Sequence, residues 1–580
     1  MKGPKEKMQT AAEVRRSASQ IMFGHLPEQT VDIEGGIWKV TRWRYPHVES
    51  AIDLDALQEE VLTAAREWST LGKDGGLSEK LRSGKRVIQV LSLDRDNGIE
   101  VNPFPKIWIC PDCGRVHRSV IGKCACGLQS RRDQLQFVSY CSDCGDIDEP
   151  PIIKCDIHQD VTIRFPGSMS AGDIKQQCPV CSKPLRSGFA GKKCRRCGKG
   201  MMAQVHRAAS VYTPRSVAIV NAATREQLER LDRAGGSAHA LEWVLSGMTT
   251  RSAEQSLAGP DSLRADLTAK KISPDLIEEL IRKAQERGEV ASTSKWPVPI
   301  SVKVEAEREA RSVALALLDS RQTVDDLAVR GPKGLRGIYG KDYREWMSRA
   351  GLEEVEYSDR FPMLTGSFGY TRGSSNNAQE SALVPYTNQQ GDFVVYGETA
   401  ETEALFVRLH PVRVLDWLRG RGLTSTPTSI RTEARREVLA AIGGDSSGTI
   451  RQAVTTLVHS YCHRFIRTAA VHTGVERTSL SEFLMPHHLA FFVYASARGD
   501  FVLGGLQAVF EGELHFLLRD FVIGEHRCAL DPGCTQTGAA CMACLHLGEP
   551  SCRLFNRSLD RRTLYGPMGY LEFSTGDWPS

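Results

Sequence analysis

The stretch IWICPDCGRVHRSVIGKCACG, residues 107–127, contains two pairs of closely spaced cysteines, Cys110 with Cys113 and Cys124 with Cys126. A glycine follows each pair, and glycine allows the backbone to turn tightly around an ion bound by sulfur. Zinc takes four ligands in a tetrahedral arrangement, commonly from such short pairs. The sequence therefore predicts a structural zinc site with these four thiolates as its ligands.

More potential ligands follow up to residue 197. A second ribbon of four thiolates is predicted from two regular pairs, Cys178 with Cys181 and Cys194 with Cys197. A third site is predicted with three thiolates and one imidazole, from Cys141, Cys144, Cys155 and His158. The alternative is interleaving, in which Cys141 and Cys144 share a metal with one half of the neighbouring ribbon and Cys155 or His158 stays free. The spacing alone does not decide between these pairings.

The cysteines near the C-terminus predict a fourth zinc site. The expected ligands are Cys534, Cys541, Cys544 and Cys552. Cys528 is an alternative candidate for the first ligand. We therefore expect three to four structural zinc ions in all, and each ion can supply on the order of 10 kcal/mol of apparent folding free energy.

The bulk composition is that of a globular multidomain protein. The chain has 580 residues, 41% apolar and 25% charged, and its formal net charge of +4 is too small to require a nucleic-acid partner. The charged start has no apolar leader, and no apolar run is long enough to span a membrane. We therefore expect a cytoplasmic protein without membrane contact. In that reducing compartment its 17 cysteines favour metal binding over disulfides.

Sequence patterns predict an α+β multidomain fold with zinc-ribbon modules inserted between an N-terminal α/β region and helical or mixed domains. Helical spacing at 53–68 precedes an apolar strand at 87–93, and the stretch 365–382, rich in Gly, Ser and Asn, is expected to be a loop. Five segments are expected: an N-terminal α/β region (1–100), a zinc-ribbon cluster (101–210), a helical region (211–300), a mixed α/β region (301–447) and a C-terminal zinc-binding domain (448–580).

Basic residues surround the second half of the predicted ribbon. Its candidate phosphate contacts are Lys192, Lys193, Arg195, Arg196 and Lys199. Cationic side chains of this kind bind nucleic acid through its backbone, independently of sequence. A solvated or protein-facing surface is the alternative interpretation.

Two groups of residues are candidates for catalytic centres. The acidic run Asp143, Asp146, Asp148, Glu149 and Asp156 could serve a metal-dependent nuclease, although an acidic contact face is the commoner role. His459 and His463 lie one helical turn apart, but Ser460 stands where a zinc protease would have its catalytic Glu, so they are expected to be core or helix-surface residues. The chain also has no convincing nucleotide-binding phosphate loop. A binding protein without catalytic activity is therefore the preferred hypothesis.

Several motifs resemble known families. GAACMACLHLGEPSCRLFNRSLDRRTL (538–564) resembles the zinc-binding domain that follows MrfA-type superfamily-two helicases. NPFPKIWICPDCG, CSDCGDIDEPP, RFPMLTGSFGYTRGS and ETEALFVRLHP are similar to stretches of DrmB, the helicase-partner subunit of DISARM antiphage systems, and the resemblance covers about 100 to 575.

This resemblance implies a bacterial defence subunit that associates with a DrmA-like superfamily-two helicase, which would hydrolyse ATP, and contacts DNA through the complex. CGDIDEPP departs from the family string, because it lacks a His and an aromatic residue. A related defence array with its own helicase is therefore an equal alternative to DISARM. A cryptic metal-dependent nuclease and a pure protein scaffold are the other two alternatives.

Overall fold

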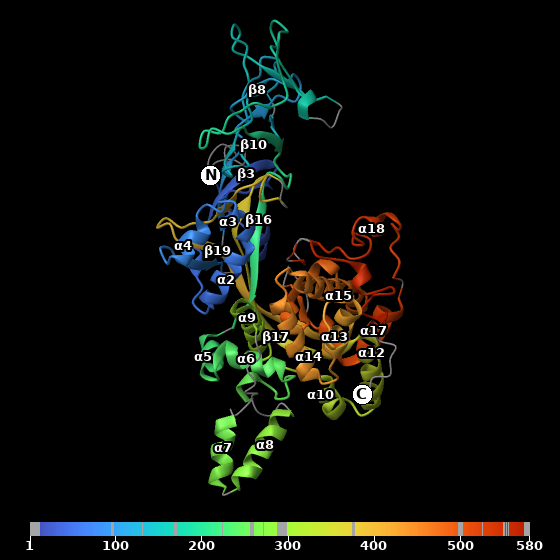
Figure 1. The fold of residues 1–580 in the computed structure, drawn as a ribbon. Helices are drawn as coiled ribbons and strands as arrows, with labels where there is room; N and C mark the ends of the chain where they lie inside the picture. Colours follow the sequence, from blue (N-terminus) through green and yellow to red (C-terminus); the bar gives the residue numbers. More distant parts are fainter. Residues whose placement is uncertain are drawn as a thin grey trace. The chain divides into compact units, whose positions relative to one another are not determined.

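The computed structural model describes residues 12–93, 98–129, 131–166, 171–222, 224–255, 260–270, 272–286, 298–373, 377–496, 503–524, 526–548, 551–552, 554 and 556–572. Its mixed α and β content agrees with the expected fold class (Figure 1). The chain divides into two compact units. Unit 1 comprises Met1–Ile219 and Leu364–Glu398, and unit 2 comprises Val220–Met363 and Thr399–Ser580. None of the helices in the described ranges is long and apolar enough to cross a membrane.

Unit 1 begins with a small antiparallel sheet. Its strand order is β1 (Ala12–Arg15), β6 (Gly98–Pro103), β3 (Gly36–Trp43) and β2 (Thr30–Ile33). Helix α1 (Ala18–Gly24) contributes Ile21 to the core beneath this sheet, where Trp38, Val40, Ile99 and Val101 are also buried. This core anchors the start of the cysteine-rich segment, because β6 ends only a few residues before Cys110.

The second part of unit 1 combines helices with strands. The predicted helix at 53–68 is α2 (Leu54–Ala64) followed by α3 (Arg66–Thr70), and the predicted strand at 87–93 is β5 (Ile88–Ser92). The other elements are α4 (Leu77–Arg82), β4 (His47–Val48), β16 (Thr213–Val220), β18 (Leu383–Pro385), the end of β17 (Leu352–Thr371) and the start of β19 (Phe393–Leu409). Strand β5 pairs in parallel with β19, with Ile88 opposite Phe393.

The composition of the stretch 365–382 predicts a loop, but β17 continues through it as far as Thr371. Its glycines serve close packing between strands. A Cβ on Gly366 would lie 2.6 Å from Cγ1 of Val395, and a Cβ on Gly369 would lie 2.5 Å from the carbonyl oxygen of Val384. A glycine in a strand often marks such a close approach of neighbouring backbone, so composition alone is misleading here.

Three small sheets form the cysteine-rich segment of unit 1. The first has the strand order β8 (Val116–His117), β7 (Trp108–Ile109) and β9 (Asp133–Gln134). The second has the order β11 (Ile147–Asp148), β10 (Phe137–Tyr140) and β15 (Met202–Val205). The third has the order β12 (Thr162–Arg164), β13 (Lys175–Gln177) and β14 (Pro184–Ser187). Their main apolar core holds only six buried residues among those described, Ile107, Ile109, Leu135, Ile163, Ile174 and Phe189. So small a core calls for additional crosslinks, such as metal ions.

Unit 2 is mainly helical. Its helices are α5 (Arg225–Arg233), α6 (Gly236–Leu245), α7 (Pro260–Ala269), α8 (Pro274–Glu286), α9 (Ile300–Ala316), α10 (Val324–Arg330), α11 (Arg336–Ile338), α12 (Arg344–Ala350), α13 (Pro411–Gly420), α14 (Arg431–Gly444), α15 (Thr449–Thr473), α16 (Gly505–Ala508), α17 (Leu514–Ile523) and α18 (Gly533–Gln536). The two strands β20 (Leu480–Met485) and β21 (Ala490–Ala495) extend the sheet of β19. Helix α15 buries Val454, Leu457, Tyr461 and Phe465 at helical spacing and carries two histidines discussed below.

Candidate metal centres

Five groups of side chains among the described residues could hold a metal ion, because their ligand atoms all lie within 4.8 Å of one another. Centre 1 is Cys110, Cys113, Cys124 and Cys126; centre 2 is Cys141, Cys144, Cys194 and Cys197; centre 3 is Cys155, His158, Cys178 and Cys181; centre 4 is Cys528, Cys534, Cys541 and Cys544. The fifth group is His459, His463, Glu482 and Cys552. Of the 17 cysteines, all free, only Cys462 belongs to none of them.

Centre 1 contains the four thiols that the sequence predicts. The sulfur atoms of Cys110 and Cys126 are 3.6 Å apart, and those of Cys113 and Cys124 are 3.5 Å apart. Four thiolates around one tetrahedral zinc ion would lie about 3.8 Å from one another, whereas a disulfide would bring two sulfur atoms to about 2 Å. The spacing therefore fits a shared ion and excludes disulfides.

The backbone of centre 1 explains the glycine after its first pair. Gly114 has φ +72°, and a Cβ at this position would lie 2.6 Å from the carbonyl oxygen of Ile163. Its N–H donates to the carbonyl oxygen of Cys110 at 2.9 Å, which closes the turn around the two sulfur atoms. Only glycine meets both demands without strain.

Centres 2 and 3 combine their ligands differently from the main prediction. The pair Cys141 and Cys144 joins Cys194 and Cys197, not Cys155 and His158. This follows from strand pairing, because β10 ends directly before Cys141 and its Tyr140 lies opposite Met202 of β15. The interleaved alternative is therefore closer to the observed arrangement.

Centre 3 lies within the chain segment that centre 2 encloses. Strands β12 and β13 place Thr162 opposite Gln177, which brings Cys178 next to His158. Nδ1 of His158 is 3.5 Å from Sγ of Cys178 and 3.6 Å from Sγ of Cys155. The interleaved alternative leaves Cys155 or His158 free, whereas both belong to this group.

Local hydrogen bonds favour the thiolate form of Cys155 and Cys124. The backbone N–H and the side chain of His158 lower the pKa of Cys155 to about 6. Burial opposes ionisation of Cys124, but the backbone N–H of Cys126 and neighbouring side chains lower its pKa to about 6. Burial raises the pKa of Cys113 to about 12. The turns thus stabilise part of the negative charge that a zinc ion requires of its ligands.

Centre 4 contains Cys528 in place of the predicted Cys552. The Sγ atoms of Cys528 and Cys541 are 3.5 Å apart, and those of Cys534 and Cys544 are 3.7 Å apart. Asp531 accepts a hydrogen bond from the backbone N–H of Cys528 at 3.0 Å, and Arg561 pairs with Asp531 at 2.8 Å. These contacts hold Cys528 in position. The sequence offers Cys528 only as an alternative to Cys534 for the first ligand, whereas both belong to the group and Cys552 does not.

Cys552 instead joins His459, His463 and Glu482, and all four residues are buried. The sequence pattern assigns both histidines to the core or the helix surface, and it does not identify Glu482 as their partner. The available signal is the i, i+4 spacing of the histidines, which places both rings on one face of a helix.

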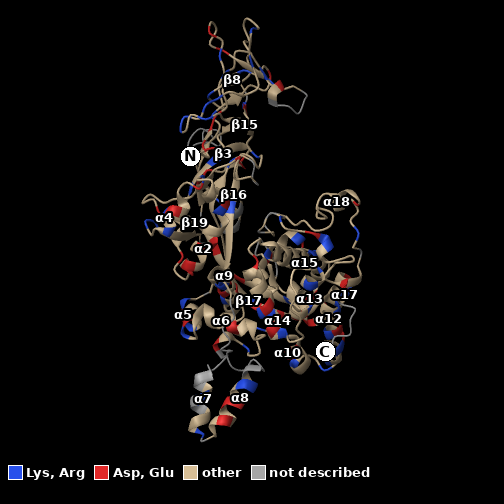
Figure 2. Ribbon diagram, in the orientation of Figure 1, with Lys and Arg blue, Asp and Glu red and all other residues tan. Residues whose placement is uncertain are grey.

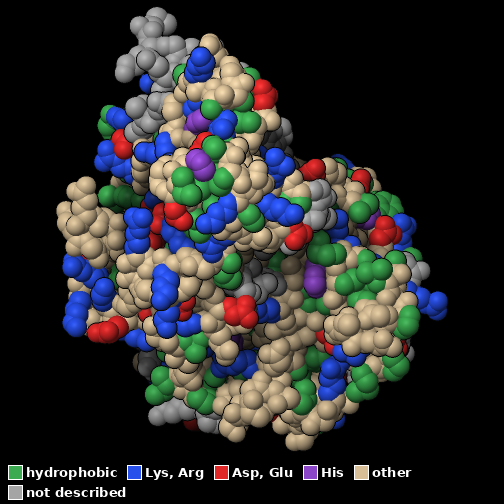
Figure 3. Space-filling model, turned by 90° about the horizontal axis from the view of Figure 1, so that it is seen from above, with side chains coloured by type: hydrophobic (Ala, Val, Ile, Leu, Met, Phe, Trp, Pro, Cys, Tyr) green, Lys and Arg blue, Asp and Glu red, His purple; other side chains and the backbone are tan. Residues whose placement is uncertain are grey.

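The predicted nucleic-acid contacts fall into two classes. Lys193, Arg195, Arg196 and Lys199 are exposed. Lys192 is not available in the same way, because its Nζ lies 2.7 Å from Oδ2 of Asp148 and also donates to the carbonyl oxygen of Glu149. Figure 2 shows both acidic and basic positions in the part of unit 1 around β8 and β15, and the face drawn in Figure 3 carries side chains of both charges.

The acidic run is engaged in contacts of its own. Asp148 pairs with Lys192, Glu149 pairs with Arg118, and Oδ2 of Asp146 lies 3.5 Å from Sγ of Cys194. Burial opposes ionisation of Asp148, but its hydrogen bond from Lys192 lowers its pKa. None of the metal-compatible groups in the described ranges includes a carboxylate of this run.

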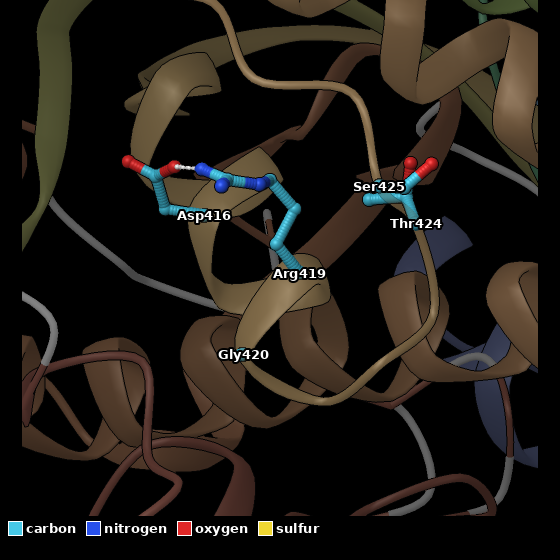
Figure 4. A pocket seen from close by; sticks show the side chains of 5 residues that line it. All are labelled: Asp416, Arg419, Gly420, Thr424 and Ser425. Carbon is cyan, nitrogen blue, oxygen red and sulfur yellow. Dashed lines mark hydrogen bonds and ion pairs between the residues drawn. The ribbon is translucent and has the colours of Figure 1, made fainter.

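A shallow pocket lies at the end of α13. Its lining residues are Asp416, Arg419, Gly420, Thr424 and Ser425 (Figure 4). Asp416 and Arg419, both on α13, form an ion pair of 2.9 Å in its lining. Its lining offers no cysteine or histidine as a nucleophile or base.

Comparison with protein families places part of this architecture in a recurring unit. Residues 17–213 match a family model described as "Domain of unknown function (DUF8724)". The matched stretch contains centres 1, 2 and 3 in full. A comparison with curated proteins gives no match.

Proposed function

We propose that this chain is a non-catalytic zinc-binding subunit of a bacterial antiphage defence complex, which associates with a superfamily-two helicase and helps it bind DNA. The observation that carries the DNA-binding part is the position of Arg195 and Arg196. Both are exposed and lie between two ligands of centre 2, Cys194 and Cys197. The helicase association and the defence role rest on the sequence resemblance described above.

The composition of the centres favours a structural role for zinc. Centres 1, 2 and 4 each offer four thiolates, and centre 3 offers three thiolates and one imidazole. Four protein ligands complete a tetrahedron and leave no position for water or substrate. Such ions stabilise the fold of small segments and perform no chemistry of their own.

A turn whose backbone is held by a metal ion is well suited to position side chains that contact phosphates. The N–H of Arg196 donates to Sγ of Cys194 at 3.4 Å, and the N–H of Cys194 donates to the carbonyl oxygen of Lys199 at 2.7 Å. The backbone of this turn is thus fixed, while the side chain of Arg195 remains 87% exposed. Cations held on a fixed backbone bind phosphates without first having to order a loop.

Charge reversal in the complex tests this proposal. We expect Arg195→Glu with Arg196→Glu to weaken DNA binding and to lower the slope of log K against log salt by about 0.9 for each phosphate of duplex DNA that the variant no longer neutralises. A matched control reverses two exposed cations elsewhere, Lys85→Glu with Arg225→Glu, and changes the net charge equally. The control should leave the slope unchanged.

Other outcomes would identify the alternative functions. Equal affinity and slope for the Arg195 and Arg196 variant and the wild type would indicate a scaffold that does not touch DNA through this turn. DNA cleavage with magnesium or manganese that Asp146→Ala abolishes, in protein that keeps its zinc, would indicate a nuclease. Co-purification from the native host would test the helicase partner directly.

A further inference from the structure

Four side chains of unit 2 meet in its interior although they come from three parts of the chain. Helix α15 supplies His459 and His463, strand β20 supplies Glu482, and Cys552 lies in the C-terminal segment. Nε2 of His459 is 3.4 Å from Sγ of Cys552 and 3.3 Å from Oε1 of Glu482. Nε2 of His463 is 3.2 Å from Oε2 of Glu482.

The two distances from His459 match two edges of a tetrahedron around one ion. With zinc bonded to nitrogen, oxygen and sulfur at its usual lengths, nitrogen and sulfur ligands would be about 3.6 Å apart and nitrogen and oxygen ligands about 3.3 Å apart. The observed 3.4 Å from His459 to Cys552 and 3.3 Å from His459 to Glu482 lie close to these values. In centre 3, the distance of 3.5 Å from Nδ1 of His158 to Sγ of Cys178 is also close to the expected separation of nitrogen and sulfur ligands.

The surroundings orient the ligand atoms toward a common point. The Nδ1–H of His463 donates to the carbonyl oxygen of Leu545 at 2.9 Å, which leaves Nε2 free to bind a metal. The backbone N–H of Asn556 donates to Sγ of Cys552 at 3.2 Å, a contact that stabilises a thiolate. Outer contacts of this kind commonly fix the ligands of protein metal sites.

The charges of the four side chains are compatible with a divalent ion. Both histidines and Glu482 have fully buried side chains, and Cys552 is 1% exposed. Neutral imidazoles, a carboxylate and a thiolate around a divalent cation sum to zero charge.

We infer that His459, His463, Glu482 and Cys552 form a fifth metal centre, which binds a divalent transition-metal ion of the zinc class and has a structural role. Its four ligands are buried and leave no open position for substrate. The ion crosslinks α15, β20 and the C-terminal segment. Because Leu545 follows Cys544, the hydrogen bond from His463 also connects this centre to centre 4.

Metal content of two alanine variants tests this inference. Purified wild-type protein should hold five ions, and Cys552→Ala should hold one fewer. Cys462→Ala is the matched control, because Cys462 is a buried cysteine of the same helix α15 as the two histidines and belongs to none of the five groups. The control should keep every ion. Equal metal content of wild type and Cys552→Ala would overturn the inference.

A second measurement needs no substitution and applies even if Cys552→Ala fails to fold. Crystals of the full-length wild type, measured at the zinc absorption edge, should show an anomalous peak about 2.0 to 2.3 Å from the four ligand atoms. Peaks at centres 1 to 4 without one among His459, His463, Glu482 and Cys552 would show an ion-pair network instead. Neither result depends on whether the protein binds DNA or a helicase.

Discussion

The sulfur atoms of Cys144 and Cys194 lie 3.5 Å apart, although 50 residues separate the two cysteines in the sequence. The antiparallel pairing of β10 with β15 accounts for this contact, because Cys144 follows the first strand closely and Cys194 shortly precedes the second. The segment between them folds into its own metal-compatible group, centre 3. Centres 2 and 3 are therefore nested along the chain.

Paired substitutions should distinguish nested from consecutive centres. Cys141→Ala with Cys194→Ala removes two ligands of one nested centre, so we expect the loss of one zinc ion. Cys178→Ala with Cys194→Ala removes one ligand from each of two centres, so we expect the loss of two. If the ribbons were consecutive, the first variant would lose two ions and the second would lose one. The zinc content per protein chain distinguishes the two arrangements. Each variant serves as the control for the other, because both lose two thiols.

The sequence specifies the half-sites of centres 2 and 3 but not their combination. The spacing of Cys141 with Cys144, or of Cys178 with Cys181, depends on the local geometry of one turn, so it is visible in a short stretch. Which two turns share an ion depends on strand register, for example on Tyr140 lying opposite Met202. Such pairing is set by tertiary contacts between strands far apart in sequence, and no local pattern encodes it.

Contacts between segments far apart in sequence also bring the C-terminal ligands together. Glu482 lies on a strand 19 residues beyond His463, and nothing in the spacing relates it to Cys552. The two come together because the N–H of Glu482 donates to the carbonyl oxygen of Ser551 at 3.2 Å. By contrast, helix α15 follows from the helical spacing of its apolar residues, and strands β5 and β21 follow from short apolar stretches, which are local properties.

Lys192 should act on stability and not on DNA binding. Its side chain is 17% exposed and pairs with Asp148, which is 26% exposed. We expect Lys192→Met to lower the free energy of unfolding by about 1 to 2 kcal/mol, because Asp148 then loses its hydrogen-bonded cation. Exposed Lys193 is the matched control, and Lys193→Met should change stability by less than about 0.5 kcal/mol.

Thermal unfolding and DNA titration together check this assignment. Lys192→Met should lower the unfolding midpoint and leave the salt dependence of DNA binding by the complex as in the wild type. A variant with unchanged stability and a reduced salt slope would show that Lys192 contacts phosphate instead. The sequence alone does not separate Lys192 from its neighbours, because its partner Asp148 is distant in the chain.

His487 lies between two carboxylates of α9 in unit 2. Its Nδ1 is 2.7 Å from Oε1 of Glu309, and its Nε2 is 3.3 Å from Oε2 of Glu305, which also pairs with Arg451. Burial opposes its protonation, but Glu309 and Glu305 raise the pKa of His487 to about 9. His487 also lowers the pKa of Glu305 to about 2. The imidazolium is thus an internal counterion for both carboxylates at neutral pH.

The raised pKa predicts how stability depends on pH. The folded protein binds this proton more tightly than the unfolded chain, whose histidine has a pKa of about 6.5, so the stabilisation is complete below about pH 6.5 and is lost as pH rises to about 9. The difference between the folded and unfolded pKa values of His487 corresponds to about 3 kcal/mol of stability. We therefore expect His487→Gln to destabilise the protein at pH 6 by about this amount and to differ little from wild type near pH 10. His488 provides a control of opposite sign, because burial lowers its pKa and it favours folding as the neutral form. Denaturant titrations at several pH values measure how the free energy of unfolding depends on pH. A loss of stability in His487→Gln that stays constant from pH 6 to pH 10 would contradict the assigned ion pairs.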